Sequence, residues 1–373
     1  MLRNRRLATA DIETCNSTAR SRSELEHQVY NQQVSAYISC PISFLLLNNF
    51  TQSHTPIPTP TMLAIVGASG KLGFATLSAL LEHKLIPASQ IVCTTSSPSG
   101  ADKLRRLDKD LQVRSANWDD QGSFEAAFEG CDKIFLISSS RIERDFHDAP
   151  PNQGRESDQI LALEAATKAG VRHVYYTSLA FANPSQSRVM KAHERTEEWL
   201  AQQTALRWTV LRMGLYSESW PLYFGHYAFP GDERKVVRVG GDGKISWTAI
   251  ADIGLASALV LAADAGEWEG ETFYLSQRQA WTLKETAEMV GKVRGKDVKF
   301  EVVSREEHER YHVKDLGLDE ANVEWWAKTY DALRNGECEI DDSTLEDLLA
   351  MKGVSPKSMK ETIKEMFAAA SKS

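Results

Sequence analysis

The stretch Leu63-Ala-Ile-Val-Gly67-Ala-Ser69-Gly70-Lys71-Leu72-Gly73 decides the fold of this chain. Its first four residues are apolar and predict a buried strand, and the amphipathic residues from Lys71 to Glu82 predict a helix. A GxxGxxG pattern between a strand and a helix is typical of the turn that receives the phosphates of a dinucleotide. The sequence therefore predicts a dinucleotide site at this turn.

Glycine is needed at each of the three positions of the turn for a separate physical reason. Gly67 allows a tight turn, Gly70 lets backbone N–H groups approach a pyrophosphate, and Gly73 lets the helix pack closely on the strand. The positive end of the helix dipole then favours the negative charge of the phosphates. We expect the cofactor to contact the whole turn, which comprises Gly67, Ala68, Ser69, Gly70, Lys71, Leu72 and Gly73.

The pattern beyond the turn alternates short β-branched runs with longer amphipathic stretches, which predicts a parallel sheet covered by helices. Strands are expected at residues 63–66, 91–95, 112–115, 133–137, 173–177 and 208–212. Helices are expected at residues 71–82, 123–129, 153–169 and 193–203. The predicted fold class is α/β, with a Rossmann-type doubly wound parallel sheet.

Three regions of the chain differ in pattern. Residues 62–212 form the predicted NAD(P)-binding domain, and residues 213–373 a smaller, mainly helical substrate-side subdomain with some elements returning to the sheet. Residues 1–60 contain neither glycine nor lysine and lack periodicity. We expect residues 1–61 to be a disordered extension or the product of a wrongly assigned start. Their acidic residues are unlike a mitochondrial transit peptide, so a cytoplasmic protein is expected.

Composition excludes several classes of function. A formal net charge of -8 argues against a nucleic-acid partner and against binding to anionic membranes. The longest strongly apolar stretch, residues 42–47, is far shorter than the roughly 18 to 20 residues that span a bilayer. The five cysteines lack a CxxC pair, which favours a reducing compartment. A small-molecule substrate is the expected partner.

The end of the second predicted strand bears on cofactor choice. NAD sites commonly place an Asp or Glu there for the ribose hydroxyls, whereas this chain has Thr94, Thr95, Ser96 and Ser97. Uncharged hydroxyls do not repel a 2′-phosphate, and Lys103, Arg105 or Arg106 could add positive charge. We therefore expect NADP(H) to be favoured over NAD(H), although the same residues would also suit an ordinary polar loop.

Several further segments, in order, resemble one known family. The chain from Met62 to Phe367 is similar to the NmrA-like group of atypical short-chain dehydrogenases, and within it to the NAD(P)H:quinone oxidoreductase type 2 branch. The resemblance rests on the glycine turn and on residues 117–120, 124–130, 133–139, 169–178, 193–200 and 208–217.

The resemblance implies further cofactor contacts. Asn117 and Trp118 would lie by the adenine, Ser138 and Ser139 by the ribose and diphosphate, and residues Gly214, Leu215, Tyr216 and Ser217 by the nicotinamide. Family members often have an arginine after the second strand for the 2′-phosphate, and the matching position here is Ser96. This departure puts the cofactor preference in question.

The catalytic pair of many short-chain dehydrogenases, YxxxK, does not occur in this sequence. Aligned on the helix before Trp199, the lysine position is His193 and the tyrosine position is Val189. A quinone accepts hydride without a strong acid, because the hydroquinone anion is delocalised, so positioning could suffice. His193, with an ordinary pKa of roughly 6.5, is the candidate catalytic residue, and Lys191 competes with it.

Two other patterns carry alternative interpretations. Tyr216, Trp220 and Tyr223 could bind a flat aromatic substrate, or form the core of the subdomain. Residues 308–312 spell HExxH, the zinc pattern of metallopeptidases. Charged neighbours there predict a solvated helix, so no metal is expected.

Three functions fit these observations. The first is an NAD(P)H-dependent oxidoreductase that reduces a quinone or similar flat acceptor by direct hydride transfer. The second is a non-catalytic NADP(H) sensor with a protein partner, which the missing YxxxK also suits. The third is a tailoring reductase of secondary metabolism that keeps the cofactor site and changes the pocket.

Overall fold

The computed structural model describes residues 61–264 and 266–372. Within them, a parallel sheet of seven strands has the order β11-β6-β5-β4-β1-β2-β3. Its strands are β1 (Leu63–Val66), β2 (Ile91–Thr95), β3 (Gln112–Ser115), β4 (Lys133–Leu136), β5 (His173–Leu179), β6 (Arg207–Met213) and β11 (Thr272–Leu275). Apart from β11, this is the doubly wound order of dinucleotide-binding folds.

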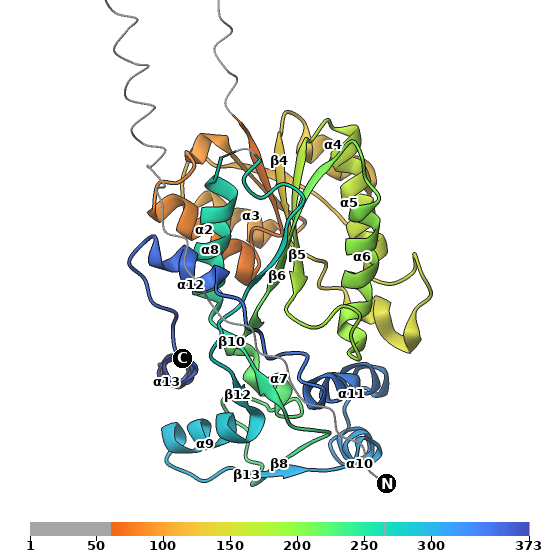
Figure 1. Cartoon of the computed structure of the whole chain (residues 1–373), viewed down its shortest axis with the longest axis vertical. Coiled ribbons are helices and arrows are strands. Elements are labelled where there is room, and N and C mark those ends of the chain that lie inside the picture. The colour runs from red at the N-terminus through yellow and green to blue at the C-terminus, as the bar shows by residue number, and fades with distance from the viewer. Residues whose placement is uncertain (1–60, 265, 373) are drawn as a thin grey trace, which may run out of the picture. The chain divides into compact units, whose positions relative to one another are not determined.

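Helices cover both faces of this sheet (Figure 1). One face carries α2 (Lys71–Glu82), α3 (Pro98–Arg105) and α8 (Ile250–Ala262), and the other carries α4 (Gln121–Phe128), α5 (Glu156–Lys168) and α6 (Lys191–Ala201). Small residues let α2 and α8 approach closely, since a Cβ on Gly254 would lie 2.8 Å from the Cβ of Ala75. The predicted α/β fold is confirmed.

Most predicted elements begin and end near the expected residues. Strands β1, β2 and β3 and helix α2 match the predicted bounds. Helix α3 was not predicted, because its first residues, Pro98-Ser-Gly, are typical of a turn; Ser97 caps it by accepting a hydrogen bond from the Gly100 N–H. Two elements that follow Met213 in the chain return to this domain: strand β11 joins the sheet, and helix α8 packs against α2.

The remaining residues after Met213 form a smaller subdomain below the sheet in Figure 1. Its helices are α7 (Trp220–Tyr223), α9 (Leu283–Arg294), α10 (Arg305–Arg310), α11 (Glu320–Arg334) and α13 (Met359–Ala370), while α12 (Thr344–Ala350) packs against α8. Short strand pairs join them: β7 (Leu215–Tyr216) with β10 (Trp247–Thr248), β9 (Lys244–Ile245) with β12 (Trp281–Thr282), and β8 (Val236–Val239) with β13 (Lys299–Val302).

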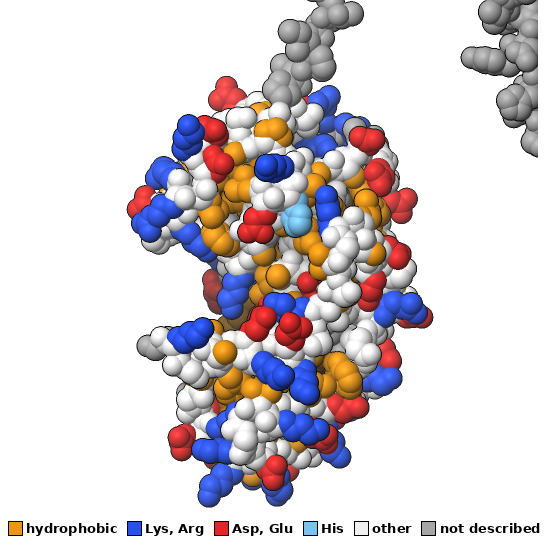
Figure 2. Space-filling model, turned by 90° about the vertical axis from the view of Figure 1, so that its left-hand side faces the viewer, with side chains coloured by type: hydrophobic (Ala, Val, Ile, Leu, Met, Phe, Trp, Pro, Cys, Tyr) orange, Lys and Arg blue, Asp and Glu red, His pale blue; other side chains and the backbone are white. Residues whose placement is uncertain are grey.

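Three hydrophobic clusters hold these layers together. One lies between the sheet and α2 and α8, the second lies between the sheet and the opposite helices, and the third is the aromatic core of the subdomain. Figure 2 shows acidic and basic side chains interspersed over one face of the molecule. Among the described residues, no helix has both the length and the hydropathy needed to cross a bilayer.

Candidate dinucleotide site

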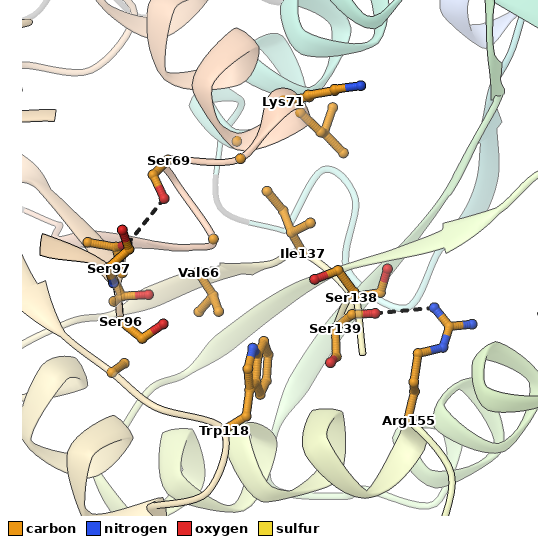
Figure 3. A pocket seen from close by; sticks show the side chains of 18 of the residues that line it. Val66, Ser69, Lys71, Ser96, Ser97, Trp118, Ile137, Ser138, Ser139 and Arg155 are labelled. Carbon is orange, nitrogen blue, oxygen red and sulfur yellow. Dashed lines mark hydrogen bonds between the residues drawn. The ribbon is translucent and has the colours of Figure 1, made fainter. Parts of the chain in front are cut away.

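A cavity of about 510 Å³ opens where the central strands end. Strand β1 lies between β2 and β4, with Val66 level with Thr94 on one side and Leu136 on the other. Because parallel strands end at one edge, the residues that follow them converge there (Figure 3). Among the described residues that line the cavity there is no aspartate or glutamate. The cavity is thus suited to an anionic ligand.

The glycine turn forms one wall of the cavity and is tightly closed. Gly67 has a φ of 75°, a conformation that favours glycine, and its carbonyl accepts a hydrogen bond from the Gly70 N–H at 3.0 Å. A Cβ on Gly73 would lie 2.4 Å from the Gly67 carbonyl oxygen. Gly67, Ser69, Gly70, Lys71, Leu72 and Gly73 line the cavity, whereas Ala68 is buried beneath them.

Helix α2 begins at this wall without a side-chain cap. No side chain accepts a hydrogen bond from its first turn, and that turn contains no acidic residue. The first N–H groups and the positive end of the helix dipole are therefore available to a phosphate. These backbone groups, rather than the exposed side chain of Lys71, fit a pyrophosphate, since that side chain points away from the other labelled residues (Figure 3).

The end of β2 forms the adjoining corner. Thr95, Ser96 and Ser97 line the cavity, and the Thr95 hydroxyl lies 3.1 Å from the Ser69 hydroxyl. Lys103 on α3 extends back over this corner, where its Nζ donates to the Ser69 carbonyl at 3.4 Å and lies 3.6 Å from the centre of the Phe74 ring. Arg105 instead pairs with Asp102 at the surface.

Trp118 forms the wall beyond this corner. It lines the cavity together with Ala116 and Phe124, and its ring centre lies 5.0 Å from that of Phe124. Asn117, expected beside it, is exposed and does not line the cavity, because its side-chain oxygen accepts a hydrogen bond from the Asp119 N–H at 3.1 Å. The Trp118 ring therefore lines the cavity, and the Asn117 amide lies outside it.

The segment after β4 forms the opposite side. Ser138 and Ser139 both line the cavity. The Ser138 N–H donates to the Thr177 hydroxyl at 3.0 Å, and the buried Ser139 hydroxyl donates to Asp158 at 2.7 Å. The Ser139 carbonyl accepts a hydrogen bond from Arg155 at 3.2 Å (Figure 3). Each serine is therefore held by a group from a neighbouring element.

Arg155 is a cavity residue that sequence reasoning missed. Its side chain is 6% exposed and pairs with the equally buried Asp145, Nε donating to the carboxylate at 2.6 Å. A second guanidinium nitrogen donates to the Val189 carbonyl at 3.0 Å. Residues 139–156 contain several charged side chains, and nothing in the local pattern marks which of them is buried.

His193 lies beside this end of the cavity in surroundings unlike the expected ones. The side chain is fully buried, and its Nδ1 lies 2.8 Å from the hydroxyl of Tyr176, which also contacts Gln159. Burial, with Arg155 nearby, holds the pKa of His193 well below its ordinary value. His193, which is among the residues that line the cavity, is therefore neutral rather than a group with an ordinary pKa. The exposed Lys191 pairs with the buried carboxylate of Glu194.

The segment after β6 contributes one cavity residue, Tyr216. Gly214, Leu215 and Ser217, expected near the nicotinamide, are buried and do not line the cavity. A Cβ on Gly214 would lie 2.3 Å from the Thr248 hydroxyl, because β7 and β10 pair closely there. Leu215 and Ser217 alternate with Tyr216 and face the other side of this extended segment, and Gly214 has no side chain to reach the cavity.

Trp220 and Tyr223 form part of the subdomain core, which is the second of the two interpretations that the sequence allowed. Trp220 has no exposed surface and packs on Phe224 at a centre-to-centre distance of 5.1 Å, while Tyr223 packs edge-on against Trp247 at 4.9 Å. Neither residue lines the cavity. Both rings belong to the aromatic core of the subdomain, so they do not contact a substrate in this cavity.

The HExxH segment also differs from expectation. His308 and His312 are both fully buried, not solvated, and their ring centres are 4.0 Å apart. Helix α10 ends at Arg310 and a π turn follows, so the two rings pack into the subdomain core. Within the described part of the chain, no group of three or more metal-ligating side chains is assembled.

The sheet order and the uncapped glycine turn together define a dinucleotide-binding Rossmann protein. A family model described as NAD(P)H-binding matches residues 67–258. The chain is 32% identical to quinone oxidoreductase 2 of Escherichia coli K12 over 292 residues, which are 77% of this chain and 93% of the relative. It is 25% identical to the NmrA-like family domain-containing oxidoreductase flvB of Aspergillus flavus, over 79% of this chain and 92% of that protein.

The comparison with a solved structure indicates the same family. The NADPH complex of the NADPH-dependent quinone oxidoreductase QOR2 from Escherichia coli matches with a TM-score of 0.68 and 31% identity, over 82% of this chain and all of that one. The chain belongs to the NAD(P)H-binding family and is an oxidoreductase of the NmrA-like, quinone oxidoreductase 2 type. The predicted resemblance is confirmed.

Proposed function

We propose that this protein transfers hydride from NADPH, used in preference to NADH, to a quinone or a similar flat conjugated acceptor. The observation that carries the proposal is the cavity, which is large enough for a cofactor and has no acidic residue among its described lining. The likeness to quinone oxidoreductase 2 supports a quinone as the acceptor, and the complex of that relative with NADPH supports the cofactor.

The residues that line the cavity suit a dinucleotide bound in one orientation. The glycine turn and the N-terminus of α2 would hold the diphosphate, and Trp118 and the end of β2 would hold the adenosine. The nicotinamide would then lie toward Leu179 and Tyr216, on the other side of β1. When bound there, the reduced cofactor supplies the hydride.

The preference for NADPH rests on charge at the end of β2. The residues that line this corner are hydroxyl-bearing, and the Lys103 ammonium reaches the Ser69 carbonyl. A 2′-phosphate is attracted by a nearby cation and is not repelled by a carboxylate here. We also propose a reducing compartment, the cytoplasm, because Cys93, Cys131 and Cys338 are buried free thiols.

The test is oxidation of NADPH and of NADH by the purified full chain, with menadione as acceptor and the absorbance of the reduced nicotinamide as readout. We expect turnover that depends on menadione and a larger kcat/KM for NADPH. Tight NADPH binding without turnover of any quinone would overturn the proposal in favour of a sensor. Turnover only with other conjugated substrates would favour a tailoring reductase.

A further inference from the structure

A hydride acceptor also needs a proton, and few groups near the nicotinamide end of the cavity can supply one. His193 is buried and neutral, with Nδ1 against Tyr176. The guanidinium of Arg155 is held by Asp145, Ser139 and Val189, and arginine does not give up its proton in proteins. Serine hydroxyls are far weaker acids than a phenol. One phenol, Tyr216, remains among the described lining residues.

The side chain of Tyr216 has the features of a donor that is kept for a ligand. It is partly exposed and lines the cavity, and within residues 61–264 and 266–372 its hydroxyl makes no hydrogen bond. Burial, and secondly the nearby carboxylate of Glu218, raise the pKa of Tyr216. The phenol therefore carries its proton at neutral pH.

The backbone that carries Tyr216 is firmly placed. Tyr216 is level with Thr248 in the β7–β10 pair, and Leu215 is level with Trp247. Two residues earlier, the Gly214 N–H donates to the Leu275 carbonyl at 2.8 Å, which ties the segment to β11. The side chain also packs against the hydrophobic cluster between the sheet and helices α2 and α8, and this packing restricts the ring, as positioning of a catalytic group requires.

We propose that the Tyr216 hydroxyl donates a hydrogen bond, and then its proton, to the carbonyl oxygen of the acceptor. This inference rests on the proposed function. In the step, a quinone gains a hydride, with its two electrons, from NADPH, which is oxidised to NADP⁺. The resulting hydroquinone anion takes the proton from Tyr216 Oη to give the hydroquinone. The phenolate then regains a proton from water.

The first test compares Tyr216→Phe with the unaltered protein. We expect kcat with menadione to fall at least about tenfold, which is below the range usual for general acids because the hydroquinone anion is delocalised. The dissociation constant for NADPH, measured by its fluorescence, should change less than about twofold, since the ring remains. Tyr311→Phe is the matched control, because Tyr311 lies in the π turn and does not line the cavity.

The second test does not depend on turnover. The infrared carbonyl band of menadione bound to the NADP⁺ complex should shift to lower frequency in the unaltered protein, as hydrogen bonding requires, and less in Tyr216→Phe. Equal bands or equal kcat values in the two proteins would overturn the role of Tyr216 and leave the proposed function intact. Failure of the unaltered protein to bind or reduce menadione would overturn both.

Discussion

Gly73 is the residue of the glycine turn with the least space for a side chain. A Cβ there would meet the Gly67 carbonyl oxygen at 2.4 Å and the Ala68 Cα at 2.8 Å, and both belong to the backbone. Gly67 is required for another reason, its φ of 75°, since a Cβ there would make only an ordinary 3.7 Å contact with Ile137. Gly73 is therefore required for close packing, and Gly67 for the backbone conformation of the turn.

Gly73→Ala should displace the start of α2 from the turn. We expect the free energy of unfolding, from urea titration, to fall by about 1–3 kcal/mol, as overpacking does, together with weaker NADPH binding. Gly231→Ala is the control, because nothing lies within 4 Å of a Cβ there. Unchanged NADPH affinity in a folded Gly73→Ala protein would contradict the placement of the diphosphate.

Lys103 is the cation by which the NADPH preference can be measured. Lys103→Ala should weaken NADPH binding by about twofold to fivefold, the range of an exposed ion pair, and leave NADH binding unchanged. Fluorescence titration with both cofactors measures the ratio. Lys109→Ala, an exposed lysine outside the cavity, should change neither value. An equal loss for both cofactors would show that Lys103 does not distinguish the 2′-phosphate.

At the scale of elements, the buried pair Arg155–Asp145 joins the segments around the nicotinamide end. Arg155 precedes α5, Asp145 lies in the loop after β4, and Val189 belongs to the turn before α6. Helix α11 supports the same turn, because the Thr329 and Ser187 hydroxyls lie 3.0 Å apart. The cavity wall thus depends on three segments that meet at one guanidinium and on α11, which supports one of them.

Removing both members of this pair should cost less than the sum of the two single removals. Arg155→Met leaves a buried carboxylate without its partner, a change that typically costs about 3–5 kcal/mol. The double variant Arg155→Met/Asp145→Asn should lose less than the sum of the two single variants. Urea unfolding of all four proteins measures the coupling. Additive losses would mean that the two side chains do not stabilise each other.

Over the whole molecule, buried neutral histidines link stability to pH. Burial lowers the pKa of His173 and of His226 to about 4, and that of His308 to about 3. In the unfolded chain these groups titrate near 6.5. Below that pH the unfolded state binds more protons than the folded state, so stability is fully present above about pH 6.5 and falls as the pH drops toward about 4.

His308→Phe should make the protein less sensitive to acid. Each such histidine contributes a slope of up to about 1.4 kcal/mol per pH unit between about pH 6 and pH 5, and the variant loses one of them. The free energy of unfolding in urea at several pH values gives the slope for both proteins. An identical slope would show that His308 keeps an ordinary pKa in the folded state.

The local pattern was sufficient for much of the fold and for part of the site. The glycine turn, except for Ala68, and the residues from Thr95 to Ser97 line one cavity, because both segments directly follow strands whose order the motif implies. Their contacts with the cofactor stay a prediction. Arg155 could not be predicted, since its burial depends on Asp145, Ser139 and Val189, which lie on three other segments. Trp220 and Tyr223 could not be assigned either, because the sequence does not show whether these aromatic side chains face the cavity or the subdomain core.

The first strand, the turn and helix α2 can be predicted from the sequence, because strand and helix periodicities and glycine conformation act over a few residues. The sequence also determined the absence of a carboxylate at the end of β2. Tertiary structure alone decided that His193 is neutral, that His308 and His312 are buried, and that Tyr216 reaches the cavity. Burial and electrostatic surroundings are sums over groups distant in the chain, so they exist only once the layers have packed.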